Sequence, residues 1–434
     1  MGPGEVATIL LGTFFVLLIL RVPVAFALGI ACLPPLLFDP QVSLFVLIDQ
    51  MYTSYNSFLL LAVPFFLLAA NVMNAGGITD RMLNLSRTMV GHFPGALAQM
   101  NVVLSVLFAG VSGSATADAA SQSKIFIPAM VKEGYDKSFS VANTAVSSVL
   151  SVVIPPSILM VIWAGTLSIS VGSLYIGGIL PGIMLCLAMM ITVHVYAKVR
   201  HYPRFARANF SEFLKAGFIA VPALFMPFII AGGKIFGWFT ATESAAIAGV
   251  YAIFLALFVF REMNLKVLFA TFVDTGRFSA VSLFCLGTAS VFGWLLAYYK
   301  VPNALLQHAV DWDMGVTATG FFVAGVFLVV GCFLDAIPAI VIVGAILQPL
   351  TQHAGMDPLH YALIGIVSLA FGLVTPPYGL CLLIATAASG EPLKAVIKDT
   401  MIQILPLLLV LVTVIMLPQL YLYLPHLMGP DLGP

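Results

Sequence analysis

The chain has 434 residues, of which 61% are hydrophobic and only 8% are charged, and its mean hydropathy is +1.09. A soluble domain carries roughly 25% charged residues, so this composition excludes an ordinary soluble protein and indicates a polytopic membrane protein. The 18 Lys and Arg residues balance the 18 Asp and Glu residues, so no overall charge points to nucleic acid. At about 20 apolar residues per helical span, the chain has room for roughly ten to thirteen membrane segments.

Apolar runs between charged residues or Pro and Gly breaks predict the membrane helices. We expect them near residues 5–20, 22–38, 57–76, 136–170, 174–197, 211–232, 240–260, 277–299, 357–388 and 400–424. Two further apolar stretches, 94–132 and 315–352, are interrupted near their middle by small polar residues. Each arm is then only about 17 residues long, so we expect two re-entrant helical hairpins with polar tips.

The distribution of basic residues predicts the topology. With residue 1 outside and both hairpins non-crossing, 15 of the 18 Lys and Arg residues, from Arg21 to Lys398, lie on the cytoplasmic side. Lys234 and Lys300 lie outside, and Lys124 lies within a hairpin arm. We therefore expect the first hairpin to enter from the cytoplasm and the second from the outside. Both chain termini are then expected on the outside.

An internal repeat relates the two halves. The ungapped shift that carries Gly110 onto Gly331, which we call the repeat shift, also superimposes residues of the same type elsewhere: Pro128 on Pro349, Asp136 on Asp357, and Pro155–Pro156 on Pro376–Pro377. Only 26 residues are Pro, so the coincidence indicates a duplicated unit. The first inverted repeat is residues 1–200, with hairpin 94–132 and broken helix 136–170. A cytoplasmic linker at 201–215 precedes the second, residues 211–434, with hairpin 315–352 and broken helix 357–388.

The predicted fold is an all-α polytopic membrane protein of two inverted repeats, each with a re-entrant hairpin and a helix broken by Pro-Pro. Secondary transporters have this architecture and bind substrate and ions near the bilayer midplane. Two successive prolines break a helix and free carbonyl oxygens. At that depth the oxygens need a partner, and a cation is one candidate.

Two Na⁺ sites follow if each hairpin tip faces the proline break of its own copy. Site 1 is predicted from Ser112, Gly113, Ser114, Ser147, Val153, Ile154 and Pro155, and site 2 from Gly331, Leu334, Asp335, Ser368, Thr375, Pro376 and Gly379. Hydroxyl and carbonyl oxygens suit Na⁺, whose single charge needs little compensation. Structural roles are open alternatives, because Ser114 and Asp335 are suited to cap helices and Ser147 and Ser368 to pack them.

The ordered set of motifs resembles the large membrane subunit, the DctM-like M subunit, of TRAP (tripartite ATP-independent periplasmic) transporters. The resemblance covers nearly the whole chain and rests on Gly110-Val-Ser-Gly-Ser-Ala-Thr116, Ile127-Pro-Ala-Met130, Gly134-Tyr-Asp-Lys137, Ile154-Pro-Pro-Ser-Ile158, Leu334-Asp-Ala-Ile-Pro338, Asp357-Pro358 and Leu373-Val-Thr-Pro-Pro-Tyr-Gly379. It implies an elevator-type secondary transporter with Na⁺ as the coupling ion and no other cofactor. It also implies a periplasmic substrate-binding protein and a small four-helix membrane subunit, here a separate chain.

The resemblance implies an organic anion as substrate, such as a C4-dicarboxylate or sialic acid. No Arg lies at a midplane position, so hydroxyl groups and helix N-termini at the hairpin tips are expected to hold the anion. The substrate-binding residues predicted on this basis are Ser114, Thr116, Pro156, Asp335 and Pro377. Lys124 could approach the substrate, but its distance from the tip favours snorkelling or pairing with an acid.

Two alternatives stay open from the sequence. One is a stand-alone divalent anion/Na⁺ symporter of similar two-hairpin architecture, which needs no binding protein. The other is an intramembrane aspartyl protease that uses Asp118 and Asp335 as acid and base, although neither residue lies in a motif of such proteases. We expect a transporter and not an enzyme.

Overall fold

The computed structural model describes residues 2–20, 22–304, 314–376 and 378–428. Among the predicted positions, Arg21 and Pro377 lie outside the described residues. The described chain is helical and contains no strand, which confirms the all-α class. Seven of its helices are long and apolar enough to cross a membrane, and nine if each of two bent helix pairs counts as one span. The protein is therefore a multi-pass membrane protein.

The first half runs from α1 to α12. Its elements are α1 Pro3–Ile19, α2 Val24–Ala31, α3 Leu33–Phe38, α4 Phe45–Tyr55, the 3-10 turn η1 Leu59–Leu61, α5 Ala62–Ala75, α6 Ile78–Val90, α7 Ala96–Ser112, α8 Ala115–Lys132, α9 Lys137–Ser148, α10 Leu150–Val153, α11 Ile158–Leu167 and α12 Val171–Val199. Helices α4 and α6 were not predicted. Helix α4 has only 11 residues and passes as a span only together with the helix that follows it, whereas α6 has 13 residues and carries three charged side chains, Asp80, Arg81 and Arg87.

The second half runs from α13 to α24. Its elements are α13 Phe210–Pro227, the π-helix η2 Phe228–Gly232, α14 Gly233–Ile235, α15 Ala241–Phe254, the π-helix η3 Leu255–Val259, α16 Leu265–Tyr298, α18 Val316–Phe333, α19 Ala336–Ala339, the π-helix η4 Ile340–Gly344, α20 Ala345–His353, α21 Pro358–Gly372, α22 Leu380–Ser389, α23 Leu393–Met416 and α24 Pro418–Met428.

Two predicted helix starts are wrong by several residues. Helix α16 begins at Leu265 instead of near 277, because the Asn264 side chain accepts a hydrogen bond from the Val267 amide at 2.9 Å and caps the helix. Helix α23 begins at Leu393 instead of near 400. Asp399, the charged residue next to the predicted start, is buried within the helix and hydrogen-bonded.

The duplicated unit is visible in the helix ends. The repeat shift relates four boundaries: the end of α7 at Ser112 to that of α18 at Phe333, the start of α8 at Ala115 to that of α19 at Ala336, the end of α8 at Lys132 to that of α20 at His353, and the start of α9 at Lys137 to that of α21 at Pro358. Each half thus contains a helix pair with a short tip, followed by a broken helix. Which membrane face each pair enters from stays a prediction.

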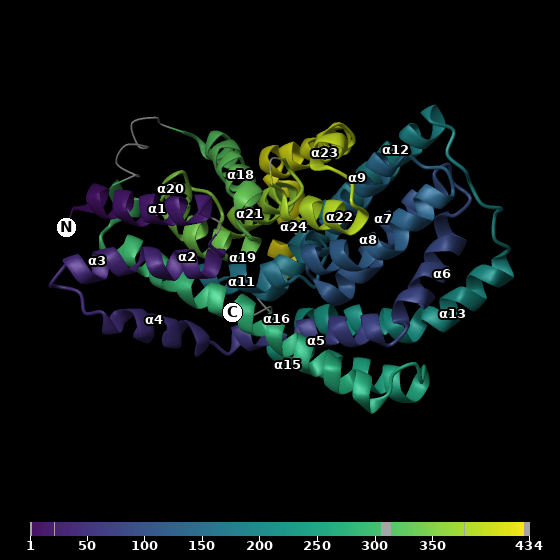
Figure 1. Cartoon of the computed structure of the whole chain (residues 1–434), viewed down its shortest axis with the longest axis horizontal. Coiled ribbons are helices and arrows are strands. Elements are labelled where there is room, and N and C mark those ends of the chain that lie inside the picture. The colour runs from purple at the N-terminus through teal and green to yellow at the C-terminus, as the bar shows by residue number, and fades with distance from the viewer. Residues whose placement is uncertain (1, 21, 305–313, 377, 429–434) are drawn as a thin grey trace.

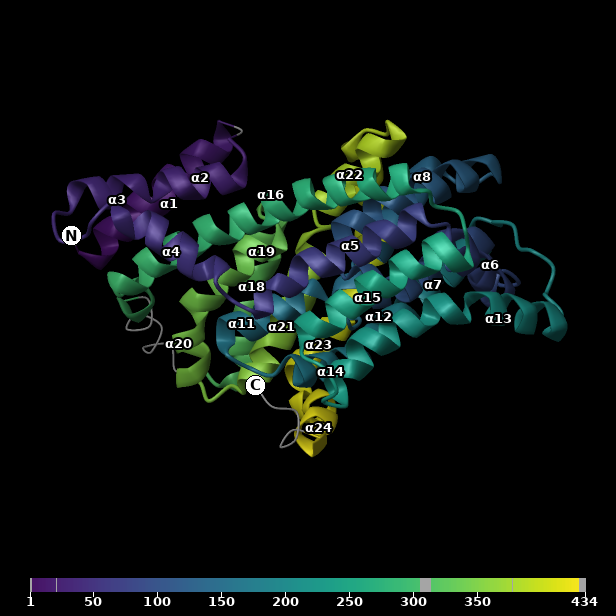
Figure 2. The same cartoon turned by 90° about the horizontal axis from the view of Figure 1, so that it is seen from below.

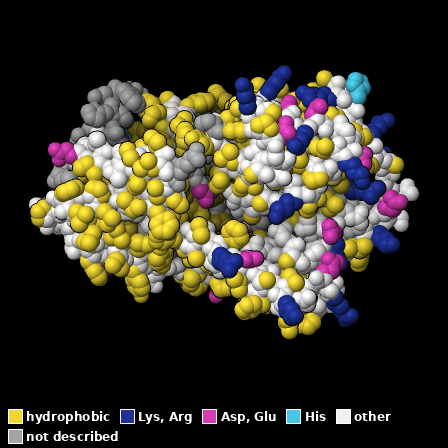
Figure 3. Space-filling view, in the orientation of Figure 1, with side chains coloured by type: hydrophobic (Ala, Val, Ile, Leu, Met, Phe, Trp, Pro, Cys, Tyr) yellow, Lys and Arg dark blue, Asp and Glu magenta, His cyan; other side chains and the backbone are white. Residues whose placement is uncertain are grey.

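The helices lie mainly along the long axis of the molecule (Figures 1 and 2). Helices α1–α4 lie at one end of the molecule, whereas α6 and α13 lie at the other. The long α16 packs against α2, α4 and α5, and so links the two ends. Lys and Arg side chains gather on the half that holds α6 and α13, which we call the basic end, and hydrophobic side chains cover much of the other half (Figure 3).

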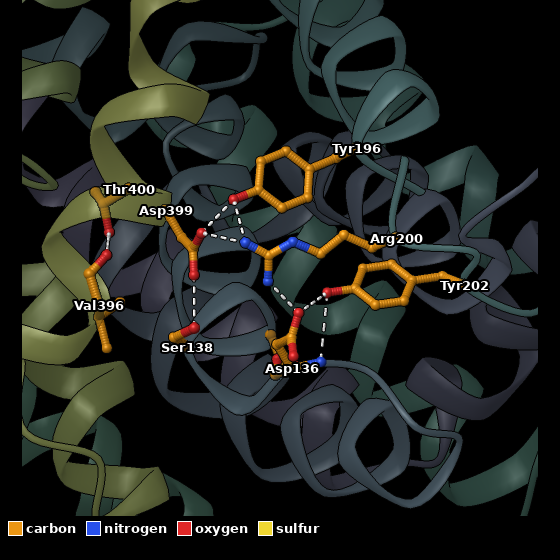
Figure 4. A network of polar contacts seen from close by, with 9 residues as sticks. Asp136, Ser138, Tyr196, Arg200, Tyr202, Val396, Asp399 and Thr400 are labelled. Atoms are coloured by element: carbon orange, nitrogen blue, oxygen red, sulfur yellow. Dashed lines mark hydrogen bonds and ion pairs between the residues drawn. The ribbon is translucent and has the colours of Figure 1, made fainter. Parts of the chain in front are cut away.

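A polar network ties three helices together at the basic end (Figure 4). The Arg200 guanidinium, directly after α12, forms an ion pair and a hydrogen bond with the Asp136 carboxylate before α9. A second Arg200 nitrogen lies 3.6 Å from the Asp399 carboxylate of α23. The Ser138 hydroxyl of α9 donates to Asp399 at 2.5 Å, and the Tyr196 hydroxyl of α12 also donates to that carboxylate.

The Asp136 carboxylate is held in its charged form by this network. The Tyr202 hydroxyl donates to it at 2.6 Å, and the Arg200 guanidinium donates to it as well. These two hydrogen bonds, with Tyr202 contributing most, lower the pKa of Asp136 below its ordinary value. The charged carboxylate therefore stabilises the junction between α8 and α9.

Candidate functional site

The tip of the first hairpin lies against the break of the first broken helix. Helix α7 ends at Ser112 and α8 begins at Ala115, with Gly113 at φ +56° between them. The Gly113 carbonyl accepts a hydrogen bond from the Ile158 amide at 3.4 Å. A Cβ on Gly113 would lie 3.1 Å from the Pro156 carbonyl oxygen. Glycine permits both this backbone conformation and this close approach, so the tip lies against the break.

The tip of the second hairpin meets the second break in a related way. The Gly379 amide donates to the Cys332 carbonyl at 3.3 Å. At Gly331, directly before Cys332, α18 comes into backbone contact with α21. A Cβ on Gly331 would lie 3.0 Å from Gly372 Cα, and one on Gly372 would lie 2.6 Å from Gly331 Cα. Both hairpin tips are thus held against backbone that the breaks leave outside regular helix.

A cavity of about 410 Å³ is lined by both hairpin tips. Gly113, Ser114 and Thr116 line it from the first hairpin, and Asp335 lines it from the second. The other walls come from α5, which contributes Asn71 and Asn74, from α16, which contributes Phe278 and Ser282, and from residues beside the two breaks, such as Ile158 and Leu373. Its size and its mixed apolar and polar lining are typical of a small-molecule site.

Ser114 and Asp335 occupy equivalent positions and both cap helices. The Ser114 hydroxyl accepts from the Ala117 amide at 3.5 Å, and the Asp335 carboxylate accepts from the Ala336 amide at 2.8 Å. Both also line the cavity, where Asp335 is exposed. Capping uses only part of the acceptor capacity of each oxygen, so these side chains can cap a helix and contact a ligand together.

Most other predicted ion-site residues lie behind the tips, outside the cavity lining. The Ser112 hydroxyl donates to the Asp118 carboxylate at 2.7 Å, and the Thr375 hydroxyl donates to the Phe371 carbonyl at 2.7 Å. Leu334 and Val153 are buried, whereas Pro376 is half-buried. Pro156, which was predicted to bind substrate, is also buried and is not among the cavity lining residues. Ile154 and Pro155 line a separate apolar pocket of about 280 Å³ beside α12. The two ion sites stay predictions.

The two repeat-related serines differ in their surroundings. The Ser147 hydroxyl donates to Asn101 Oδ1 and to the Thr144 carbonyl, both at 3.1 Å. The Ser368 hydroxyl is fully buried and has no hydrogen-bond partner in the described part of the chain. A buried hydroxyl without a partner is costly, and a bound cation is one group that would satisfy its oxygen.

A buried polar network holds the first hairpin to its broken helix. Asn101 of α7 is its centre: its Nδ2 donates to Gln122 Oε1 of α8 at 2.5 Å, and its Oδ1 accepts from Asn143 Nδ2 of α9 at 2.9 Å. The Ser105 hydroxyl donates to Gln122 Oε1 at 3.1 Å. These side chains are almost completely buried, so the network joins three helices within the core of the protein.

An aromatic cluster plays the corresponding part in the second half. Trp163 of α11 is fully buried and packs edge-on against Tyr361 of α21 and Phe327 of α18, with ring centroids 5.1 and 5.5 Å apart. A Cβ on Gly365 would lie 2.3 Å from the indole ring, and one on Gly344 would lie 3.3 Å from it. A side chain of the first repeat therefore fills a slot in the second.

The sequence analysis did not predict several of the residues that line the cavity. Asn71 and Asn74 lie one turn apart on α5, and two amides in an apolar helix are the signal that could have identified them. Ser282 lies in the long α16, which gives no comparable signal. Lys124 was expected to snorkel or to pair with an acid, but it lines the cavity.

Comparison with known proteins adds three findings. The profile of the family described as "Tripartite ATP-independent periplasmic transporter, DctM component" matches residues 11–424. The chain is 34% identical to the C4-dicarboxylate TRAP transporter large permease protein DctM of Pseudomonas aeruginosa, covering 91% of this chain and 92% of that protein. It is 31% identical to the sialic acid TRAP transporter large permease protein SiaM of Vibrio cholerae, covering 95% and 96%.

A solved structure shows a similar fold. The crystal structure of the YdaH transporter of Alcanivorax borkumensis, described as having an unusual topology, superimposes with a TM-score of 0.61 at 16% sequence identity. The match covers 92% of this chain and 91% of that one. At this identity the likeness extends to the fold alone.

Proposed function

Because the chain belongs to the DctM component family of tripartite ATP-independent periplasmic transporters, we propose that it uses Na⁺ to import an organic anion delivered by a periplasmic substrate-binding protein. The chain is a transport component and not an enzyme, since its relatives are named as permeases. The protease alternative is also disfavoured by geometry, because Asp335 lines the cavity whereas Asp118 lies behind the tip, bonded to Ser112.

The observation that carries the proposal is the cavity shared by the two hairpin tips. Each tip abuts the break of its own repeat, through Gly113 and Ile158 in one half and through Cys332 and Gly379 in the other. A ligand in the cavity would touch both tips at once, while ions beside the breaks would stiffen the same tips. This arrangement offers a route by which Na⁺ binding raises the affinity for substrate.

The transport step that we propose is an elevator movement. The two hairpins and the two broken helices move together as the transport domain, carrying the cavity, while helices such as α5 and α16 form the scaffold. Asp335, Ser114 and Thr116 hold the substrate from the transport domain, and Asn71 and Asn74 face it from the scaffold. A small four-helix membrane subunit, as a separate chain, would enlarge that scaffold in the lipid bilayer.

The orientation in the membrane is part of the proposal. The gathering of Lys and Arg at one end of the molecule supports the cytoplasmic assignment of the basic end (Figure 3). The N-terminus lies toward the opposite end (Figure 1), so it would be periplasmic in a bacterial inner membrane. We propose the same side for the C-terminus.

Uptake by proteoliposomes that contain the chain and its small subunit tests the proposed function. Labelled organic acids are offered with an inward Na⁺ gradient, with and without the cognate binding protein. We expect uptake to require both. Uptake that needs Na⁺ alone would identify a stand-alone symporter, and uptake that persists unchanged when K⁺ replaces Na⁺ would refute the coupling.

A further inference from the structure

The cavity between the hairpin tips is lined by a basic side chain that has no ion-pair partner among the described residues. Lys124 of α8 is the one basic residue among its described lining residues, and Asp335 is the one acidic residue. The Lys124 side chain is exposed, and it forms no ion pair with any described residue. It therefore faces the cavity without a partner that would neutralise its charge.

The rotation of α8 about its axis fixes where Lys124 points. Ala117, Ala120, Ser121 and Lys124 line the cavity at helical spacing and so form one stripe. The buried Gln122 lies on another face, where its Oε1 accepts from Asn101 and from Ser105. Rotating α8 so that Lys124 left the cavity would break these buried hydrogen bonds, so the helix keeps the base of the Lys124 side chain at the cavity wall.

Two amides of α5 line the same cavity. Asn71 Nδ2 donates to the Thr275 hydroxyl at 2.9 Å, which holds this side chain in position. Asn74 Oδ1 accepts from the Thr79 hydroxyl at 3.4 Å, which leaves its NH₂ group to donate to a ligand. An ammonium and an amide donor from two different helices match the acceptor oxygens of a carboxylate.

The charges also discriminate between acids. A carboxylate bound at Lys124 neutralises the one cationic lining residue, so a second carboxylate would find no described basic partner there. It would instead face the exposed Asp335, and like charges in a confined site repel. Hydroxyl groups fit better, because they can donate to Asp335 and exchange hydrogen bonds with Ser114 and Thr116.

We propose that Lys124 binds the carboxylate of the transported anion and that the preferred substrate is a hydroxylated monocarboxylate, such as a sugar acid, and not a dicarboxylate. This inference rests on the proposed function, because it assumes that the cavity carries the substrate. It assigns to Lys124 a selective role that the hairpin tips alone do not provide.

Binding to the chain with its small subunit in nanodiscs tests the proposal without the binding protein. The probes are three sugar acids, gluconate, galactonate and glucuronate, and two dicarboxylates, succinate and malate, each measured by thermal shift in Na⁺ and in K⁺. We expect at least one sugar acid to bind more tightly than both dicarboxylates. A dicarboxylate as the tightest probe, or no response to any of the five, would overturn the proposed substrate class.

Variants of α8 test the residue itself. We expect Lys124→Gln to weaken sugar-acid binding at least tenfold and Lys124→Arg to restore most of it. Lys132→Gln, which removes a charge at the end of the same helix outside the cavity lining, should bind as the unchanged protein does. Unchanged affinity in Lys124→Gln would refute the role of Lys124.

The two proposals fail in different ways. Na⁺-dependent uptake that survives Lys124→Gln with an unchanged KM would refute the inference and leave the transport function intact. Sugar-acid binding that needs Lys124 but is the same in Na⁺ and K⁺ would support the inference and refute the ion coupling.

Discussion

The two hairpins have matching helix boundaries but are attached to the rest of the molecule by different chemistry. In the first, α7 and α8 are joined to α9 through the amides of Asn101, Gln122 and Asn143. The repeat shift carries these positions onto Phe322, Val343 and Ile364, all apolar. There α18 and α21 approach to backbone contact at Gly331 and Gly372. The same backbone geometry therefore does not require the same interactions.

The comparison teaches what specifies a hairpin within a membrane. Apolar side chains gain nothing from leaving lipid, so packing of small residues and hydrogen bonds between helices must hold helices together. The first hairpin relies mainly on hydrogen bonds, and the second mainly on close packing and aromatic contacts. We expect the two halves to respond differently to substitutions of equal size.

The largest effect is expected where the second hairpin is tightest. Gly372→Ala would place a Cβ 2.6 Å from Gly331 Cα, and overpacking against backbone should cost about 3 kcal/mol. Gly325→Ala, on α18, meets nothing within 4 Å and should gain stability by up to about 1 kcal/mol, because alanine favours a helix. Apparent Tm values at a fixed scan rate measure both. Shifts of the same sign would contradict the close-packing interpretation.

The first hairpin should be most sensitive at the centre of its polar network. Asn101→Leu leaves Gln122, Asn143 and Ser147 without their shared partner, and we expect a loss of about 2 kcal/mol, seen as a lower Tm. The triple variant Asn101→Leu/Gln122→Val/Asn143→Ile imitates the second repeat and removes two of the three stranded groups, while Ser147 keeps its bond to the Thr144 carbonyl. It should be more stable than the single variant; a still lower Tm would show that hydrogen bonds are indispensable here.

Ser368 and Ser147, one from each predicted ion site, should differ in how much they affect the Na⁺ dependence of uptake. Ser368→Ala removes a buried hydroxyl that has no described partner, so it should raise the Na⁺ concentration for half-maximal uptake about tenfold, equivalent to about 1.4 kcal/mol, with little change in Tm. Ser147→Ala removes a hydroxyl that already has two acceptors and should change the Na⁺ dependence less. Equal Na⁺ dependence in Ser368→Ala and the unchanged protein would remove Ser368 from the site.

The smallest effect is expected at the basic end. The pKa of Asp136 is lowered, so its carboxylate contributes stability above its ordinary pKa of about 3.9, and this contribution is lost as pH falls through the lower value in the folded protein. Because the side chain is 48% exposed, we expect less than about 1 kcal/mol. The Tm difference between the unchanged protein and Asp136→Asn should shrink below about pH 4. The exposed Asp274→Asn serves as control, and a difference that grows on acidification would contradict the assignment.

Much of the fold could be predicted from the sequence because its signals are local. Pro155–Pro156 and the equivalent pair interrupt helices wherever they lie, and Gly113 and Ser114 end one helix and begin the next through backbone conformation and capping. The repeat shift was visible for the same reason, since glycines, prolines and caps determine helix ends. Helices α4 and α6 escaped because α4 is too short to span a membrane alone and α6 carries three charged side chains.

The walls of the site were less predictable, because they depend on which helices meet. Asn71 and Lys124 lie far apart in the chain, and no sequence motif indicates that they line the same cavity. Trp163 resembles any other apolar residue of a span until Gly344 and Gly365 are found around it. Tertiary contacts of this kind leave no periodic trace in a single sequence.

The slot around Trp163 shows that the two halves have ceased to be interchangeable parts. Under the repeat shift, the glycines that make room for its indole correspond to Ser123 and Thr144 in the first half, and Trp163 itself corresponds to Ile384. The two halves still share the path of the backbone. The contact of Trp163 with the second half, however, has no equivalent in which a side chain of the second half enters the first. A chain assembled from two copies of the first half would have the indole without its slot, and one assembled from two copies of the second half would have the slot without the indole. Neither half can therefore replace the other.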